Sequence, residues 1–163
     1  MRRRGFALAI GTVLVAAVIL RVQLLDTVTV SSDSMTPTVC TGDTVLLHRL
    51  DGGQPVRVDD IVTFANPQGG GRVIKRVVAL AGQAVAIADS LLMVDGVAVD
   101  EPYVDHSTID GVYFGPVTVP DGSVFVMGDR RENSIDSRAY GPIAIAALDG
   151  RMLWDLTTAC CDS

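Results

Sequence analysis

Lysine is almost absent from this sequence. The chain has 163 residues, and of its 13 basic residues 12 are arginines and one is Lys75. Histidine is nearly as rare: the sequence has two, His48 and His106. Neither has a neighbour in the sequence that is typical of a metal-binding motif. No metal centre is therefore predicted. The single lysine raises the question of what it does that a further arginine could not do.

Charge is absent from a long run near the N-terminus. Residues 5–20 are uncharged and mostly apolar, with three arginines at residues 2–4 before them and Arg21 after them. If Arg21 snorkels, the apolar stretch continues to Leu25, about 21 residues or roughly 31 Å of helix, which is long enough to cross a bilayer. The hydrophobic content of 48% agrees with a membrane segment.

Two interpretations of this run compete: a cleaved secretory signal and an uncleaved anchor. A signal needs a small-x-small cleavage site soon after its apolar core, and residues 21–25 offer none. We therefore expect a transmembrane anchor within residues 1–25, with the arginine-rich N-terminus in the cytoplasm. Residues 26–163 would form an extracytoplasmic domain at the cell membrane, held by one span, and the lipid bilayer would be one of its partners.

The part of the chain after residue 25 is strongly acidic. All 19 acidic residues lie there with nine of the 13 basic ones, which gives a formal charge of −10. A surface of that sign repels phosphate backbones, so nucleic acid is not expected as a partner.

The cysteines are few and odd in number. Cys40, Cys160 and Cys161 would lie in an oxidising compartment, where at least one of them must remain unpaired. Two arrangements are open: a disulfide from Cys40 to the tail, or a small buried Cys40 with a reduced tail.

Long helices are not predicted after residue 25; the segment is instead typical of β-structure. Short runs rich in Val, Ile and Leu recur at residues 44–50, 60–65, 72–80, 84–88, 91–94 and 123–128. Turn signals separate them, and Asp95-Gly96 predicts a two-residue hairpin. Only residues 143–148 could form a helical turn. The expected fold is mainly β, one coiled antiparallel domain preceded by a transmembrane helix.

Lys75 lies in the predicted strand 72–80. Side chains alternate along a strand, so Lys75 shares a face with Val73 and Val77. Desolvation among apolar groups can lower a lysine pKa to roughly 7 or 8, where the amine can act as a base. Arginine stays protonated and cannot follow that path. The alternative is a lysine that guards a sheet edge against aggregation.

A possible nucleophile lies just beyond the predicted anchor. Thr36 precedes Pro37, which favours an extended conformation, and Ser32 and Ser34 would then face the same way. One hydroxyl could attack a carbonyl while the other helps a backbone N–H to stabilise the oxyanion. The alternative is a serine-rich loop that is merely solvated.

A third polar stretch, residues 128–141, follows an apolar strand. Ser134, Asp136 and Arg138 alternate in it, as do Asp129 and Arg131. One interpretation has Ser134 orienting the lysine amine while an Asp136–Arg138 pair braces the site. The other is a solvated loop whose surface ion pairs each contribute under about 1 kcal/mol.

Together these stretches resemble the sequence boxes of the type I signal peptidases, membrane-anchored Ser/Lys endopeptidases of the S26 class. The boxes are residues 34–38, 42–45, 75–78 and 128–138, in the family's order. The resemblance implies a β-domain of the signal-peptidase type with no metal or organic cofactor. It also implies that exported preproteins are cleaved after small residues in an Ala-x-Ala pattern.

The same resemblance assigns roles to individual residues. Ser34 would be the nucleophile and Lys75 the general base; Ser32 would help the oxyanion hole and Ser134 would position the lysine. Asp129, Asp136 and Arg138 would support them. A histidine-based triad is not expected, because no box contains a histidine.

The sequence departs from the family pattern at two places. Residues 79–83 are Ala-Leu-Ala-Gly-Gln instead of the usual Gly-Leu-Pro-Gly-Asp, and Arg130 stands where asparagine is usual. Two alternatives to a general signal peptidase therefore stay in view: a Ser/Lys maturation peptidase with a narrow substrate range, and an idle anchored β-domain that binds exported chains. The complete set of Ser34, Lys75 and Ser134 argues against the idle domain.

Overall fold

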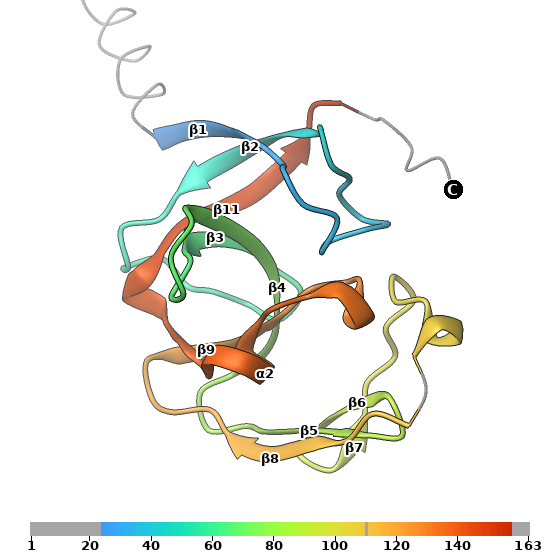
Figure 1. The fold of residues 1–163 in the computed structure, drawn as a ribbon. Coiled ribbons are helices and arrows are strands. Elements are labelled where there is room, and N and C mark those ends of the chain that lie inside the picture. The colour runs from blue at the N-terminus through green and yellow to red at the C-terminus, as the bar shows by residue number, and fades with distance from the viewer. Residues whose placement is uncertain (1–23, 110, 158–163) are drawn as a thin grey trace, which may run out of the picture.

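The structure is a computed structural model that describes residues 24–109 and 111–157. Two antiparallel sheets form this described part of the protein (Figure 1). In these residues the larger sheet has the strand order β1-β2-β11-β3-β4-β9-β10, and the smaller has the order β7-β6-β5-β8. The larger sheet contains β1 (Leu25–Thr29), β2 (Thr44–Arg49), β3 (Ile61–Ala65), β4 (Arg72–Leu80), β9 (Ser123–Met127), β10 (Ile143–Ala144) and β11 (Leu148–Asp155). The smaller contains β5 (Ala84–Ala88), β6 (Leu91–Val94), β7 (Val97–Ala98) and β8 (Phe114–Thr118).

Helical structure in these residues is limited to single turns. They are α2 (Ser137–Tyr140), η1 (His106–Thr108), η2 (Arg131–Asn133) and η3 (Ile145–Ala147). The predicted mainly β, antiparallel fold is thus confirmed, and the Val- and Ile-rich runs lie in strands. The hairpin at Asp95-Gly96 is confirmed as well: both residues have positive φ, 53° and 79°, as a type I′ turn between β6 and β7 requires.

No helix in the described ranges has the length and apolarity to span a bilayer. The predicted anchor lies outside these ranges apart from its last two residues, and Leu25 is already the first residue of β1.

The last strand joins the two halves of the larger sheet. β11 lies between β2 and β3, with Met152 opposite Leu47 on one side and Arg151 opposite Val62 on the other. β11 therefore connects the pair β1-β2, formed early in the chain, to the group β3-β4-β9-β10.

β4 changes neighbours along its length, and this change positions the site. Residues 72–76 pair with β3, and residues 76–80 pair with β9 on the opposite side. Residues 72–75 consequently have no strand partner on the β9 side in the described structure, and Lys75 is the last residue of this unpaired edge.

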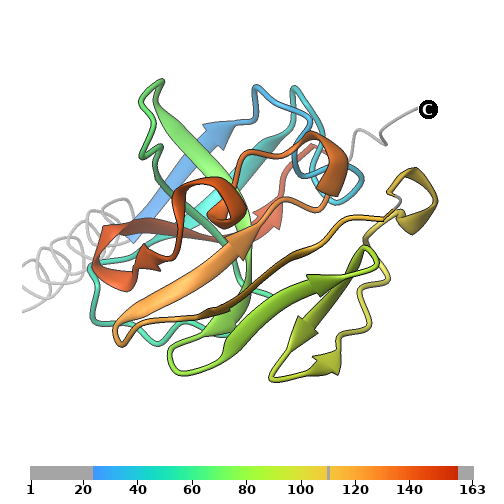
Figure 2. The same ribbon diagram turned by 60° about the horizontal axis from the view of Figure 1, so that its bottom comes forward.

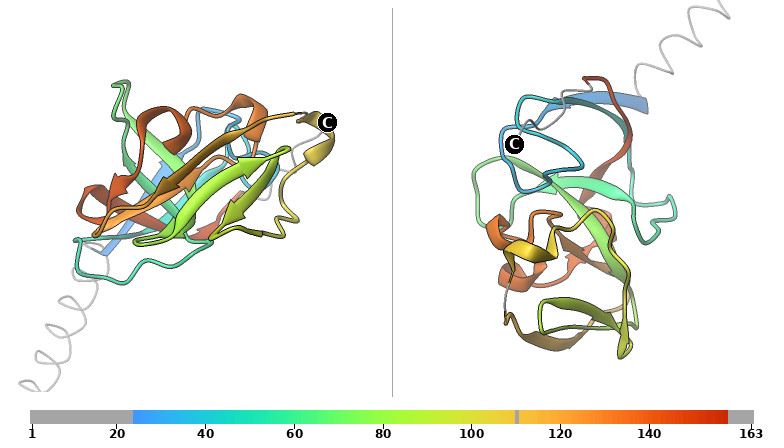
Figure 3. Two further views of the ribbon diagram at one scale, coloured as in Figure 1. Left: turned by 90° about the horizontal axis from the view of Figure 1, so that it is seen from below. Right: turned by 90° about the vertical axis from the view of Figure 1, so that its right-hand side faces the viewer.

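The smaller sheet packs against the β4–β9 end of the larger one (Figure 2). Val78 and Phe125 of the larger sheet meet Val85, Ile87 and Leu92 of the smaller one in a shared core. The loop after β1 stands at the other end of the domain, as the right-hand view in Figure 3 shows. A separate cluster holds this loop in place; its buried members are Val30, Met35, Val39, Val45, Leu47 and Ile74.

Candidate active site

Ser34 and Lys75 are in direct contact although 41 positions separate them. The Lys75 Nζ donates a hydrogen bond of 2.6 Å to Ser34 Oγ and another of 2.9 Å to the Ile74 carbonyl oxygen. Ser34 is 6% exposed and Lys75 is 3% exposed. The structure thus brings together the predicted nucleophile and the predicted base in a nearly dry environment.

The loop that carries Ser34 is a tight turn. We expected an extended segment, but residues 34–38 form turns closed by hydrogen bonds from the Thr36 N–H to the Asp33 carbonyl and from the Val39 N–H to the Met35 carbonyl. Met35 and Val39 are fully buried, so apolar packing selects the turn over the extended form that the proline favoured. Ser32 nevertheless lies beside Ser34, with the two hydroxyl oxygens 3.4 Å apart.

Burial shapes the acid–base behaviour of Lys75. Loss of hydration lowers its pKa from 10.5 to about 8, and the positive charge of Arg138 adds to this effect. The carboxylates of Asp136 and Asp129 act in the opposite direction but do not outweigh the burial. A substantial fraction of the amine is therefore neutral near physiological pH.

Ser134 is near the pair but is not bonded to the lysine. Its buried hydroxyl lies close enough to the Asp136 carboxylate to help lower the pKa of that group, although it makes no hydrogen bond of standard geometry. It packs against Gly128: a β-carbon at Gly128 would lie 2.5 Å from the Ser34 carbonyl oxygen and closer still to Ser134 Oγ. Ser134 and the backbone of Ser34 thus both pack directly against Gly128. The role of Ser134 in positioning the lysine stays a prediction.

The predicted brace of Asp136 and Arg138 is present as a two-point ion pair. Arg138 donates from Nε and Nη2 to the two carboxylate oxygens, each at 2.8 Å, while Asp136 also accepts the Gly128 N–H at 3.0 Å. Burial alone would raise the pKa of Asp136, but the hydrogen bonds and the charge of Arg138 outweigh it and hold that pKa below its usual value. The carboxylate therefore stays charged and fixes the Gly128 backbone.

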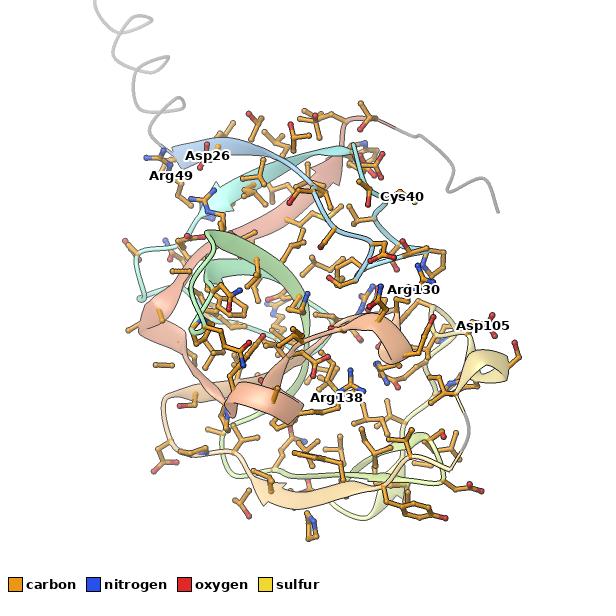
Figure 4. The ribbon with its side chains drawn as sticks, in the orientation of Figure 1. Asp26, Cys40, Arg49, Asp105, Arg130 and Arg138 are labelled. Atoms are coloured by element: carbon orange, nitrogen blue, oxygen red, sulfur yellow. The ribbon has the colours of Figure 1, made fainter. Side chains whose placement is uncertain are left out.

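Asp129 is held from β4 by Arg76, the residue after the lysine. Arg76 Nε and Nη2 donate to the two Asp129 oxygens at 2.8 and 2.7 Å, and Thr38 Oγ1 donates to the same carboxylate. The following residue, Arg130, donates its N–H to the Ser34 carbonyl at 3.1 Å. Figure 4 shows Arg130 beside the loop that carries Cys40, with Arg138 further along the same segment. The arginine that replaces the usual asparagine also pairs through its side chain with Asp33.

The sequence predicted no role for four residues that hold this site, Arg76, Thr38, Glu101 and Tyr103, although Thr38 and Arg76 lie in the family boxes. Arg76 carried one visible signal, because it follows Lys75 within the Val-rich run of the same strand. Glu101 and Tyr103 lie in residues 95–104, a segment similar to the hairpin of the family and its exit, but the partner of Glu101 is 30 positions away and its contact was not foreseen.

Cys40 is disulfide-bonded. The other two cysteines of the chain, Cys160 and Cys161, lie outside the described residues. The described residues contain no group of three or more His, Cys, Asp or Glu side chains that could hold a metal ion.

Comparison with known proteins defines the class to which this fold and site belong. The family model for signal peptidase, peptidase S26, matches residues 3–156, so the chain belongs to that family. The resemblance read from the sequence boxes is confirmed, and the chain is a serine endopeptidase of the signal peptidase class.

Particular relatives make the match more specific. The chain is 39% identical over 138 residues to "Probable signal peptidase I-1" of Synechocystis sp., covering 78% of this chain and 69% of the relative. It is 34% identical over 147 residues to "Signal peptidase I" of Bacillus caldolyticus, covering 82% and 80%. The crystal structure of a signal peptidase I from Enterococcus faecalis is similar, with a TM-score of 0.55 and 30% identity over 61% of this chain and 98% of that one.

Proposed function

We propose that this protein removes N-terminal signal peptides from exported preproteins, with Ser34 as the nucleophile and Lys75 as the general base. One observation carries the assignment of roles: the 2.6 Å contact between Lys75 Nζ and Ser34 Oγ in a buried site that lowers the lysine pKa to about 8. A lysine in this state can take a proton from serine, which an idle binding domain would not require.

The reaction follows from that contact. Neutral Lys75 accepts the Ser34 proton as Oγ attacks the scissile carbonyl carbon, and the Ile74 carbonyl keeps the amine in line. The resulting ammonium gives its proton to the leaving amine of the mature chain as the peptide bond breaks. Lys75, neutral again, then deprotonates the water that hydrolyses the ester, and the proton returns to Ser34.

The negative charge on the carbonyl oxygen needs donors beside Ser34. Ser32 is suited to this role, because its hydroxyl lies 3.4 Å from Ser34 Oγ and can turn toward an oxygen bound there. The Ser34 backbone N–H would be the second donor.

The unpaired edge of β4 offers a place for the substrate. Residues 72–75 present backbone groups without a strand partner in the described structure, and the edge leads to Lys75. An extended signal-peptide end could add there as a strand, with its side chains toward the tightly packed Val30, Met35 and Ile74. We infer that the residues next to the cleaved bond are small, in the Ala-x-Ala pattern that the resemblance to the family implies.

We also place the enzyme at the cell membrane, with residues 1–25 as a single-pass anchor and residues 26–163 outside the cytoplasm. The uncharged run with arginines on its cytoplasmic side supports this topology. Protease added to right-side-out vesicles should digest the β-domain, and full protection of that domain would contradict the topology.

The decisive experiment uses the full chain in detergent with a preprotein, followed by sequencing of the new N-terminus. Wild type should cut after a small-x-small pattern, and Ser34→Ala should lose all measurable turnover. Ser31→Ala is the matched control, because Ser31 is an exposed serine of the same loop and should behave like wild type. Residual turnover in Ser34→Ala above a few per cent of wild type would assign the nucleophile to another residue.

A further inference from the structure

A buried carboxylate that the mechanism does not use lies in the loop after β7. Glu101 is 2% exposed, and its two oxygens accept hydrogen bonds of 2.5 and 2.6 Å from Arg131 Nη1 and Nη2. Arg131 is buried as well. Buried ion pairs of this kind add little net stability compared with apolar packing, but they fix geometry, because neither partner can move without leaving a bare charge.

Arg131 has a third donor that points toward the catalytic pair. Its Nε donates to the Gly128 carbonyl oxygen at 2.9 Å, so the guanidinium holds Gly128 and Glu101 at once. Gly128 in turn lies against the Ser34 carbonyl and Ser134, with no room for a β-carbon. A line of contacts therefore runs from Glu101 through Arg131 and Gly128 to the backbone of Ser34.

A second line of contacts starts from the same loop. Tyr103 donates its hydroxyl hydrogen to Glu101 at 3.1 Å, and its ring lies 3.9 Å from the guanidinium carbon of Arg76. A cation over an aromatic face is attracted to it, which restrains the Arg76 side chain. Arg76 holds Asp129, whose successor donates its N–H to the Ser34 carbonyl. Both lines end at the same carbonyl.

We propose that Glu101 is a positioning residue of the peptidase: through Arg131 and Tyr103 it sets the place of Gly128 and Asp129, and thereby the alignment of Ser34 with Lys75. The proposal rests on the proposed function. It makes the loop after the smaller sheet a part of the catalytic unit, although Glu101 itself would touch neither substrate nor reacting atoms.

The test replaces Glu101 with glutamine in the full chain, which keeps the shape but removes the charge that Arg131 needs. We expect kcat to fall by about 10- to 100-fold, because small misplacements of catalytic groups have effects of this size. KM should stay within about twofold of wild type, since Glu101 contributes no group to the unpaired edge of β4. Rates are measured well below the unfolding temperature of each variant. Glu101→Asp, which keeps the charge, should recover part of the lost kcat.

Leu92→Ala is the matched control for loss of stability alone. Leu92 is a buried residue of the smaller sheet and takes no part in the ion pair between Glu101 and Arg131, so its truncation should lower the unfolding temperature through loss of apolar packing alone. Its kcat should remain within about twofold of wild type. If Glu101→Gln does not fold, Arg131→Lys takes its place: it keeps a positive charge beside Glu101 but cannot bond both carboxylate oxygens and Gly128, so the same loss of kcat is expected.

A readout independent of cleavage separates this proposal from the proposed function. Since Lys75 is the only lysine, labelling with ¹³Cε-lysine gives one resonance that reports the site directly. Glu101→Gln should shift this resonance and move its titration toward that of a free lysine, whereas Leu92→Ala should leave both unchanged. An unchanged resonance with unchanged kcat in folded Glu101→Gln, or an equal loss of kcat in Leu92→Ala, would overturn the positioning role. If the wild type never cleaves preprotein while Glu101→Gln still shifts the Lys75 resonance, the proposed function alone is overturned.

Discussion

Activity should rise with pH as Lys75 loses its proton. A pKa of about 8 instead of 10.5 means that the folded site as a whole disfavours the ammonium form by roughly 3 kcal/mol, with burial as the main cause. The neutral fraction then comes to about 9% at pH 7, compared with about 0.03% for an unperturbed lysine. Below pH 8, kcat/KM should therefore rise nearly tenfold per pH unit, and above about pH 9 it should level off.

The same shift makes a prediction for stability, with a defined sign. Between pH 8 and 10.5 the unfolded chain keeps the lysine proton while the folded chain releases it. The unfolded state thus binds more protons, and the free energy of unfolding rises with pH. The gain from Lys75 between pH 8 and 9.5 should be about 1.5 kcal/mol. Tyr103 and Tyr140, whose pKa values are raised by burial, act in the opposite direction only at higher pH.

The assay follows cleavage of a fluorogenic signal-peptide substrate from pH 5.5 to 9.5, with denaturant unfolding in the same buffers. Lys75→Met removes the titration, so the difference from wild type isolates the stability contribution of Lys75. Lys75→Arg keeps a positive charge but should be inactive at every pH, because arginine offers no free base. A flat profile from pH 6 to 8, or a folded Lys75→Arg protein that cleaves at the normal rate, would refute the mechanism.

Two further predictions concern the surroundings of the pair. Gly128→Ala should lower kcat by at least about 100-fold and destabilise the fold by roughly 1–3 kcal/mol, because the new β-carbon would clash with the Ser34 carbonyl oxygen and with Ser134. Steady-state kinetics measure the first effect and thermal unfolding the second. A variant that cleaves at the wild-type rate would contradict the close packing around Gly128. In peptide maps of the unreduced protein, Cys40 should appear linked to a C-terminal peptide. Cys40→Ser should lower the free energy of unfolding by roughly 2–4 kcal/mol. Alkylation of all three thiols without a reductant would show that the bond is absent in solution.

Much of the site could be predicted from local sequence, whereas the residues that depend on contacts between distant parts of the chain could not. Ser34, Lys75 and the Asp136–Arg138 pair could be predicted because each lies in a short stretch whose residue types and spacing suggest its chemistry. Glu101 and Tyr103 could not, because their meaning depends on Arg131 and Arg76, which only the folded chain brings near. The turn at residues 34–38 was misjudged for a similar reason: burial of Met35 and Val39 outweighs the local preference.

The strands show the same division. Runs of Val and Ile predicted most of them, since alternation and β-branching are local properties. The strand order is not local: nothing in the periodicity of residues 148–155 indicates that β11 enters between β2 and β3.

The position of β11 between β2 and β3 has a consequence for the order in which the enzyme folds during synthesis. The β1-β2 pair holds the loop with Ser34, and β3-β4 holds Lys75, and in the described sheet the strand that hydrogen-bonds to both pairs is β11. A chain emerging from the ribosome has made both reactive residues long before it has made the strand that unites them. Such late, long-range pairing is intrinsically slow to form. We therefore expect Ser34 and Lys75 to be held in contact only after residues 148–155 have been synthesised and have joined the sheet.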